Sequence, residues 1–489
     1  MWLAGARRDA RLRAHVTRGR LAVHAHFYQP ARLDPWTGEV PPEPSAAPFH
    51  DWNERVNAEC YRPNAARGNL GHISWDLGPT LGSWLAAKDP ATFAGFVAAG
   101  VAGNAIGQSF HHTILPLASA ADRTTEIRWG LREFELRFGR RPEGLWLPET
   151  AVDVPTLRIA DREGIRFTIL APWQAAEPVD TRRPYRVDVG GGRSIVVVFY
   201  DAGLSSAVSF EPEATSDADR FARERIAARL SPAPGVDPTA GPLAVIATDG
   251  ELYGHHQQFR DLFLQRLVTP AAGSAERTFD VVPLADAIRE APGQRHPLVR
   301  ITERTSWSCH HGVARWSAEC PDAADGRWKG PLRAALERLA AAIDVVAADA
   351  FRRLPAAPDL WELRDRYVEV VVGSTTAEAF AAAAFGAGVE PRQADRETLL
   401  TLLEAQRWRL AMFASDGWYW DDPIRSETKQ VLRSAARAAR LVDQAAGTAL
   451  EKRLVADLEL FVSPSRGLDG AEIYRTALGE IGQPAPAGG

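Results

Sequence analysis

The stretch "LAVIATDGELYGHH" (residues 243–256) decides the fold class of this chain. Five apolar residues follow one another without the alternation of a half-exposed strand, and a polar Asp-Gly pair ends the run soon afterwards. A short, continuous apolar run is typical of a parallel strand that is buried on both faces. Four other runs have the same character, and they are "LAVHAHF" (21–27), "GLWL" (144–147), "RFTIL" (166–170) and "SIVVVFY" (194–200).

Helical patterns lie between these runs. In "RTTEIRWGLREFELRFG" (123–139), apolar residues recur along one helix face, and Asp122 is the expected N-cap. A second helical pattern, "QFRDLFLQRLV" (258–268), follows the run at 243–249. The alternation predicts an α/β fold, either a βα barrel or a doubly wound sheet. No GxGxxG or Walker A motif accompanies it, so a dinucleotide or P-loop function has no support.

The second half of the chain changes character. From about residue 327 onward, Ala, Leu, Arg and Glu dominate, and helices are expected over 331–354, 395–414 and 426–461. The segment 319–330 is the expected linker.

Composition narrows the classes of function. The chain has 489 residues, of which 45% are hydrophobic, enough for at least two domains. A net charge of −5 gives no indication of a nucleic-acid or membrane partner, and no apolar run reaches the roughly eighteen residues of a membrane span. The cysteines, Cys60, Cys309 and Cys320, form no CxxC pair, so neither a disulfide framework nor a structural zinc site is expected. Cysteine usage of this kind fits the reducing cytoplasm, and we expect a cytoplasmic location.

Chemically useful side chains gather where the expected strands end. In parallel βα folds, functional groups collect at the carboxyl ends of the strands. The residues found there are His24 and His26, His111 and His112, Glu149, then Asp249, Glu251, His255 and His256, and finally Trp307, His310, His311 and Trp316.

Each of these features also has a purely structural interpretation. His24 is compatible with a hydrogen-bonded core histidine, Asp249 with a strand-ending turn, and Glu149 with an acid at a helix start. Their coincidence at strand ends favours a functional site. Glycoside hydrolysis needs two carboxyl groups on opposite sides of one bond, held in environments that keep one ionised and the other protonated. Glu149 and Asp249 are candidates for this pair.

The same motifs resemble those of glycoside hydrolase family 57. The matching stretches are "HAHFYQP" with His24 and His26, "GNAIGQSFHHTILPL" (103–117), "GLWLPE" with Glu149, the pattern D-x-E-x-x-G-x-H formed by Asp249, Glu251, Gly254 and His256, and "TSWSCHHGVARW" (305–316). The resemblance implies that Glu149 is the nucleophile and Asp249 the general acid/base. The helical half, with "MFASDGWYWDD" (412–422), resembles the C-terminal domain of a less characterised subgroup.

The resemblance also sets expectations for the whole chain. It implies a (β/α)7-type parallel barrel over 20–320, preceded by an extension (1–19) and followed by an α-helical domain (321–489) on the carboxyl-end face of the barrel. The expected activity is retaining hydrolysis or transfer on an α-glucan or maltooligosaccharide, of amylase, 4-α-glucanotransferase or branching-enzyme type, without a metal or other cofactor. The expected substrate-binding residues are His24, His26, His112, Trp146, Glu251, His256, Trp307, Asp416, Trp418 and Trp420, with Trp307, Trp418 and Trp420 as stacking platforms.

Two other functions remain open. One is a metal-dependent carbohydrate hydrolase or deacetylase on a related barrel, in which His24, His26 and Asp249 would bind zinc or another divalent ion. The other is a non-catalytic carbohydrate-binding protein, which the intact acid pair argues against.

Overall fold

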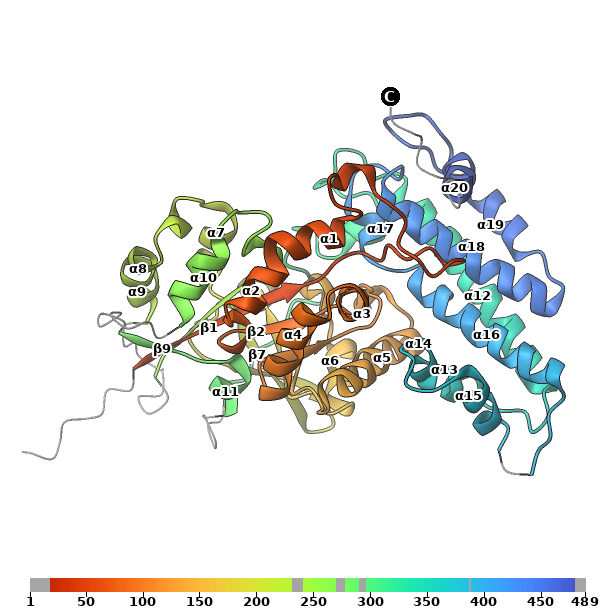
Figure 1. Ribbon diagram of the computed structural model, residues 1–489, viewed down its shortest axis with the longest axis horizontal. Helices are drawn as coiled ribbons and strands as arrows, with labels where there is room; N and C mark the ends of the chain where they lie inside the picture. Colours follow the sequence, from red (N-terminus) through yellow and green to blue (C-terminus); the bar gives the residue numbers. More distant parts are fainter. Residues whose placement is uncertain (1–17, 231–240, 270–277, 290–295, 387, 480–489) are drawn as a thin grey trace, which may run out of the picture.

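A barrel and a helical bundle make up the protein (Figure 1). The computed structural model describes residues 18–230, 241–269, 278–289, 296–386 and 388–479, so residues 1–17 of the expected extension lie outside it. The strands are β1 (Gly19–Phe27), β2 (Ser74–Leu77), β3 (Ala105–Gln108), β4 (Gly144–Trp146), β5 (Phe167–Leu170), β6 (Tyr185–Gly190), β7 (Arg193–Phe199), β8 (Leu243–Asp249) and β9 (Phe279–Val281).

The sheet runs in the order β6-β7-β5-β4-β3-β2-β1-β8, with β9 on the start of β1. Strands β1, β2, β3, β4, β5, β7 and β8 are parallel, and the backbone N–H of Asp201, just after β7, donates to Val245 O of β8 at 2.7 Å. This contact brings the two ends of the parallel series together, and the prediction of a (β/α)7-type barrel is confirmed. Strand β6, antiparallel to β7, was not expected.

The barrel interior has an apolar lower part and a polar upper part. Alternate residues of the strands point inward, and Ala22, Val198 and Val245 belong to one buried cluster. Closer to the carboxyl ends the inward positions are polar. There, His26 pairs in register with Asp76 of β2 on one side and with Asp249 of β8 on the other. The polar layer therefore lies where functional groups were expected.

Helices surround the barrel and form the second half. Those of the first half are α1 (Trp52–Val56), α2 (Arg62–Ala66), α3 (Pro79–Lys88), α4 (Pro90–Ala102), α5 (Ala120–Phe138), α6 (Val154–Arg162), α7 (Ala202–Phe210), α8 (Ala218–Phe221), α9 (Ala227–Arg229), α10 (Arg260–Val268) and α11 (Leu284–Arg289). Those of the second half are α12 (Lys329–Arg353), α13 (Leu360–Arg366), α14 (Val368–Val371), α15 (Ala377–Ala384), α16 (Gln393–Ala411), α17 (Asp416–Tyr419), α18 (Ser426–Ala446), α19 (Leu450–Leu458) and α20 (Gly470–Gly479).

Two helix predictions need correction. The helix expected over 426–461 is two helices, because the chain turns at Gly447, whose φ of 65° ends α18. The N-cap of α5 is Ser119, whose Oγ accepts from the backbone N–H of Asp122. Asp122 is the third residue of α5, and its carboxylate pairs with arginines of the second half.

Helices α12, α16 and α18 pack side by side and meet the barrel at its carboxyl end (Figure 1). Asp122 of α5 forms ion pairs with Arg364 of α13 at 2.9 Å and with Arg409 of α16 at 2.7 Å. The segment after α16 reaches the strand ends, where the backbone N–H of Ser415 donates to His112 O. None of the described helices has the length and apolar character needed to cross a bilayer.

Candidate active site

Glu149 follows β4 in a strained turn. Its φ of 57° and ψ of 21° lie in the left-handed region, which is uncommon for a residue with a side chain. The loop after Arg304 holds it: the backbone N–H of Trp307 donates to Glu149 O at 3.0 Å, while Trp307 Nε1–H and Ser308 Oγ–H donate to Glu149 Oε2 at 3.0 and 2.5 Å. The turn and the loop together fix the direction of the carboxylate.

Asp249 ends β8, on the strand adjacent to His26. Its side chain is accessible to water, yet protein surrounds it closely enough to desolvate the carboxyl group. Burial raises the pKa of Asp249 to about 6; the charge of His26 acts against this, and the charges of Glu149 and Asp76 add to it. The effect of Glu149 on Asp249 shows that the two carboxyl groups lie within electrostatic reach of each other.

Asp76 organises the two histidines of β1. His24 Nε2 lies 3.0 Å from Asp76 Oδ1, and His26 Nδ1 lies 2.8 Å from Asp76 Oδ2, with Asp76 fully buried. Burial lowers the pKa of His26, but the charge of Asp76 and its hydrogen bond, with Asp249 and Glu251, outweigh burial and raise the pKa to about 9. His26 is therefore a cation at neutral pH. His24 is fully buried, and burial lowers its pKa, so it supports Asp76 and does not reach a substrate.

A hydrogen-bonded chain runs from Asp76 into the helical half. His26 Nε2 lies 3.2 Å from His112 Nε2, and His112 Nδ1 lies 2.6 Å from Ser415 Oγ. Burial and the charge of His26 hold the pKa of His112 well below its usual value. The cationic His26 therefore donates to His112 Nε2, and the Nδ1–H of His112 donates to Ser415. The chain fixes the tautomer of each ring and ties the second half to the strand ends.

Glu251 and His256 differ in their surroundings. Glu251 is buried, and its Oε1 accepts from the Tyr28 backbone N–H at 3.2 Å and from the Tyr61 hydroxyl at 2.6 Å. Burial raises the pKa of Glu251 to about 7. His256 is exposed beside His255, and the latter pairs with Glu59.

The expected aromatic platforms fall into two classes. Trp146 and Trp418 are fully buried, so neither presents a face to a sugar ring. Trp146 stacks on His24 and His26 and meets Trp307 edge-on, while Trp418 Nε1–H donates to Lys329 O. The stacking role expected of Trp418 is therefore corrected to a packing role. Trp307 is half-buried at Glu149, and Trp420 is 42% exposed with the guanidinium of Arg425 over its ring.

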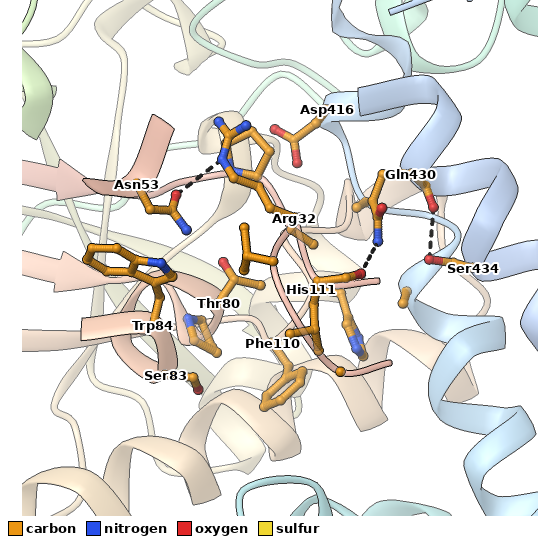
Figure 2. Close-up of a pocket in the computed structure, with 18 of the residues that line it drawn as sticks. Arg32, Asn53, Thr80, Ser83, Trp84, Phe110, His111, Asp416, Gln430 and Ser434 are labelled. Carbon is orange, nitrogen blue, oxygen red and sulfur yellow. Dashed lines mark hydrogen bonds between the residues drawn. The ribbon is translucent and has the colours of Figure 1, made fainter. Parts of the chain in front are cut away.

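Asp416 links the acid pair to a neighbouring cavity. The Tyr28 hydroxyl donates to Asp416 Oδ2 at 2.5 Å, and both residues line a cavity of about 440 Å³ between the loop after β1, α3, α16 and α18. Figure 2 shows Asp416 at its rim, with Trp84, Phe110 and His111 among the lining residues. Burial, opposed by the Tyr28 hydrogen bond and reinforced by the charges of Glu427 and Glu149, raises the pKa of Asp416 to about 7. Neither Glu149 nor Asp249 lines this cavity, so it adjoins the acid pair through Tyr28 and Asp416.

The residues that the metal-dependent alternative would use as ligands are His24, His26 and Asp249. Among the described residues, His24, His26 and Asp249 are not part of any group whose ligand atoms lie together closely enough to hold an ion. Both histidines direct a ring nitrogen at Asp76 instead. The group that does meet the distance criterion lies elsewhere, in the loop that follows Ser308.

Sequence reasoning missed several residues of the site. Asp76 lies inside "ISWDLG", which is too short and too polar to be recognised as a buried strand, so the strand-end argument did not reach it. Tyr28, two residues after His26, and Ser308, directly after Trp307, stand within quoted motifs. Tyr419 also stands within a quoted stretch, between Trp418 and Trp420; burial and the charge of Glu149, with that of Asp249, raise its pKa.

Comparison with known proteins adds the family. Residues 102–298 match the model described as "Glycosyl hydrolase family 57", and residues 325–480 match the model described as "Domain of unknown function (DUF3536)". A comparison with curated protein sequences finds no match.

Solved structures with a similar fold include an exo-type maltose-forming amylase from Pyrococcus sp. ST04, with 15% identity, a TM-score of 0.71 and coverage of 94% of this chain and 88% of that one. A GH57-type branching enzyme from Pyrococcus horikoshii has 17% identity and a TM-score of 0.57, with 94% of each chain covered. A 4-alpha-glucanotransferase from Thermococcus litoralis has 16% identity and a TM-score of 0.54, with 87% of this chain and 60% of that one covered. With its motifs on a barrel of this fold, the chain carries a glycosyl hydrolase family 57 region over residues 102–298 and a second half of the DUF3536 type over residues 325–480.

Proposed function

We propose that the protein is a retaining glycoside hydrolase or transglycosylase that acts on α-glucans by double displacement. Glu149 attacks the anomeric carbon as the glycosidic C–O bond breaks, and Asp249 gives its proton to the departing oxygen. In the second step, Asp249 takes a proton from a water or a sugar hydroxyl, and this acceptor displaces Glu149. Atoms and charge balance because Asp249 is protonated again at the end of each cycle.

The different environments of the two carboxyl groups carry the proposal. The N–H of Trp307 and the O–H of Ser308 both donate to Glu149 Oε2, and such donors stabilise an ionised carboxylate. Asp249, in contrast, has a pKa raised to about 6 by burial and by the charge of its partner acid. One group is thus prepared to attack and the other to deliver a proton near neutral pH.

His26 supports the second role of Asp249. Its cation lies on the adjacent strand, in register with Asp249, and acts to lower the pKa of that carboxyl group. When Asp249 has given up its proton, this charge stabilises the carboxylate that remains. His26 therefore lets Asp249 alternate between acid and base during one cycle.

The substrate class rests on the family and on the exposed aromatic residues. The three similar structures are named as an amylase, a branching enzyme and a 4-alpha-glucanotransferase. Trp307 beside Glu149 is suited to stack on a sugar ring, and the face of the exposed Trp420 that Arg425 leaves free is a second candidate. A cytoplasmic location is part of this proposal, because thiols stay reduced in the cytoplasm, and Cys60, Cys309 and Cys320 are free.

Product analysis with maltoheptaose tests the proposal. We expect α-configured products at early times by NMR, and longer oligosaccharides in addition if a sugar hydroxyl competes with water. Mass spectrometry after rapid acid quenching should find a glycosyl ester on the peptide that contains Glu149. Products of inverted configuration would contradict the retaining mechanism, and binding of maltoheptaose without turnover would favour the carbohydrate-binding alternative.

A further inference from the structure

Four potential metal ligands meet in the loop between Ser308 and α12. They are Cys309, His311, Cys320 and Asp322, and one ligand atom of each lies within 4.8 Å of all the others. Both thiols are buried, Asp322 is partly buried and the His311 side chain is 44% exposed. The ligands are thus enclosed on the protein side and accessible to an ion on the solvent side, through His311.

Three of the six distances between these ligand atoms are close to the edges of a tetrahedral metal site, and the other three are below 4.8 Å. The two sulfur atoms are 3.6 Å apart, Cys320 Sγ lies 3.6 Å from His311 Nδ1, and this nitrogen lies 3.4 Å from Asp322 Oδ1. Zinc bonds of about 2.3 Å to sulfur and about 2.0 Å to nitrogen and oxygen set tetrahedral edges of about 3.8, 3.6 and 3.3 Å for the same three pairs. Each measured edge is therefore within about 0.2 Å of the ideal value.

The surroundings also provide the hydrogen bonds that support metal ligands. The backbone N–H of His310 donates to Asp322 Oδ2 at 2.9 Å, which leaves Oδ1 directed at the other ligands. The backbone amides of Arg315 and His311 hydrogen-bond the sulfur of Cys309. Such contacts orient ligating carboxylates and stabilise thiolates in metal sites.

A buried lysine next to the group indicates missing negative charge. Lys329 is fully buried, and its Nζ has no hydrogen-bond partner among the described residues. Burial and the charge of Arg315 lower the pKa of Lys329 to about 8, and the negative charges that act against this are those of Asp421, Cys320 and Cys309. Two thiolates, one carboxylate and a divalent ion have a net charge of −1, which the ammonium group of Lys329 would balance.

We propose that Cys309, His311, Cys320 and Asp322 bind one structural Zn²⁺ ion. Two thiolates with an imidazole and a carboxylate suit zinc better than calcium or magnesium, which prefer oxygen ligands. As the Zn–S bonds form, the two thiol protons leave for solvent. All four positions are filled by protein, so the site is of the structural type and leaves no open position for a substrate.

The ion would hold the loop that positions Glu149. Ser308 and Trp307, which both donate to Glu149 Oε2, directly precede Cys309. The link to catalysis rests on the function proposed above, whereas zinc binding does not. A protein with full zinc content and no glycosidase activity would count against the enzyme function only.

Metal analysis of the full chain tests the site. The protein is produced with added Zn²⁺, purified without chelator and analysed by inductively coupled plasma mass spectrometry. We expect one zinc ion per chain in the wild type, and at least about tenfold less in Cys309→Ser, Cys320→Ser and His311→Ala, since even loss of a supporting hydrogen bond costs about 10–100-fold in metal affinity. His310→Ala is the matched control: its imidazole is 93% exposed and lies 3.6 Å from Oδ2 of Asp322, the oxygen that does not face the other ligands, so zinc content should stay close to that of the wild type.

A second measurement does not depend on how the cysteine variants fold. The wild type, stripped of metal and loaded with Co²⁺, should show thiolate-to-cobalt charge-transfer absorption and the visible bands of a tetrahedral site. His311→Ala, a change at a partly exposed position, should weaken these bands. A wild type without zinc and without the cobalt bands, a Cys309–Cys320 disulfide in the purified chain, or equal zinc loss in His310→Ala and His311→Ala would each overturn the proposal.

Discussion

Ser308 donates its hydroxyl to Oε2 of Glu149 at 2.5 Å, across 159 positions of sequence. The residue that we propose as the nucleophile is thus oriented by a loop from a distant part of the chain. The backbone contact between Trp307 N and Glu149 O joins the same two segments. Because Glu149 stands in a left-handed turn, its direction depends on these contacts more than on its own strand.

Ser308→Ala should therefore lower kcat and leave KM nearly unchanged. A hydrogen bond to a charged group is worth about 1.5–3 kcal/mol, so the expected loss is about 10–100-fold. Steady-state kinetics on a maltooligosaccharide measure the change. Ser317→Ala is the control, because the Ser317 hydroxyl bonds only weakly to Val313 O within the same loop. Equal kinetics for Ser308→Ala and the control would show that the contact does not position the nucleophile.

The long apolar strands could be predicted from sequence, but the short ones could not. The five residues 243–247 are all apolar because both faces of β8 are covered there, and this lack of alternation is visible in the sequence. Strands β2 and β3 have four residues each, and β2 includes the inward Asp76, so neither stood out as an apolar run. Strand identity there depends on neighbours that only the folded sheet provides.

The site was predictable to the extent that its residues sit at strand ends. Glu149 and Asp249 follow apolar runs, and local sequence was enough to select them. The burial of Trp418 was not predictable, because it depends on packing against α12 and α18 from distant parts of the chain. The group of Cys309, His311, Cys320 and Asp322 was missed for a related reason. Its two cysteines do not have CxxC spacing, and the four residues come together only in the folded loop.

The rate should fall as pH rises above about 6. The general acid must carry a proton, and the pKa of Asp249 is raised to about 6, so the acid form is lost above that pH. The charged groups that act on it are His26, Glu149 and Asp76. His26→Gln removes a cation that lowers the pKa, so the basic limb of kcat/KM should move to higher pH. Profiles of both proteins between pH 4 and about 9 measure the shift; a limb that moved to lower pH would contradict the assignment.

Trp420→Ala should weaken substrate binding without loss of stability, and Trp418→Ala should do the reverse. Trp420 is 42% exposed, so a sugar ring can stack on its indole ring without a rearrangement of the core. Trp418 is fully buried, and truncation of a buried tryptophan costs about 3–5 kcal/mol of unfolding free energy. Isothermal titration with maltoheptaose and urea denaturation separate the two effects. Unchanged affinity in Trp420→Ala would remove this residue from the substrate site.

Asp122→Asn should loosen the contact between barrel and helical half. Arg364 is buried and loses the carboxylate that compensates its charge, whereas Arg409 keeps Asp344; removal of one partner of a buried pair typically costs about 3–5 kcal/mol. Asp349→Asn, which breaks an exposed pair with Arg352, is the control and should cost less than about 1 kcal/mol. Urea denaturation followed by circular dichroism measures both. Similar stability of the two variants would show that the buried network does not hold the two parts together.

Glu149→Gln and Asp249→Asn should fail in different ways. An amide cannot attack the anomeric carbon, so Glu149→Gln should form no glycosyl-enzyme with any substrate. Asp249→Asn should slow turnover of maltooligosaccharides by about 10²–10⁴, the usual contribution of general acid–base catalysis. With a glycosyl fluoride, whose leaving group needs no proton, Asp249→Asn should still form the covalent intermediate and then accumulate it, because no base activates the acceptor. Added azide, a nucleophile that needs no base, should release that intermediate from Asp249→Asn and have no effect on Glu149→Gln. If both variants kept wild-type rates on every substrate, the two carboxyl groups would be structural, and the different environments described above would have no catalytic meaning.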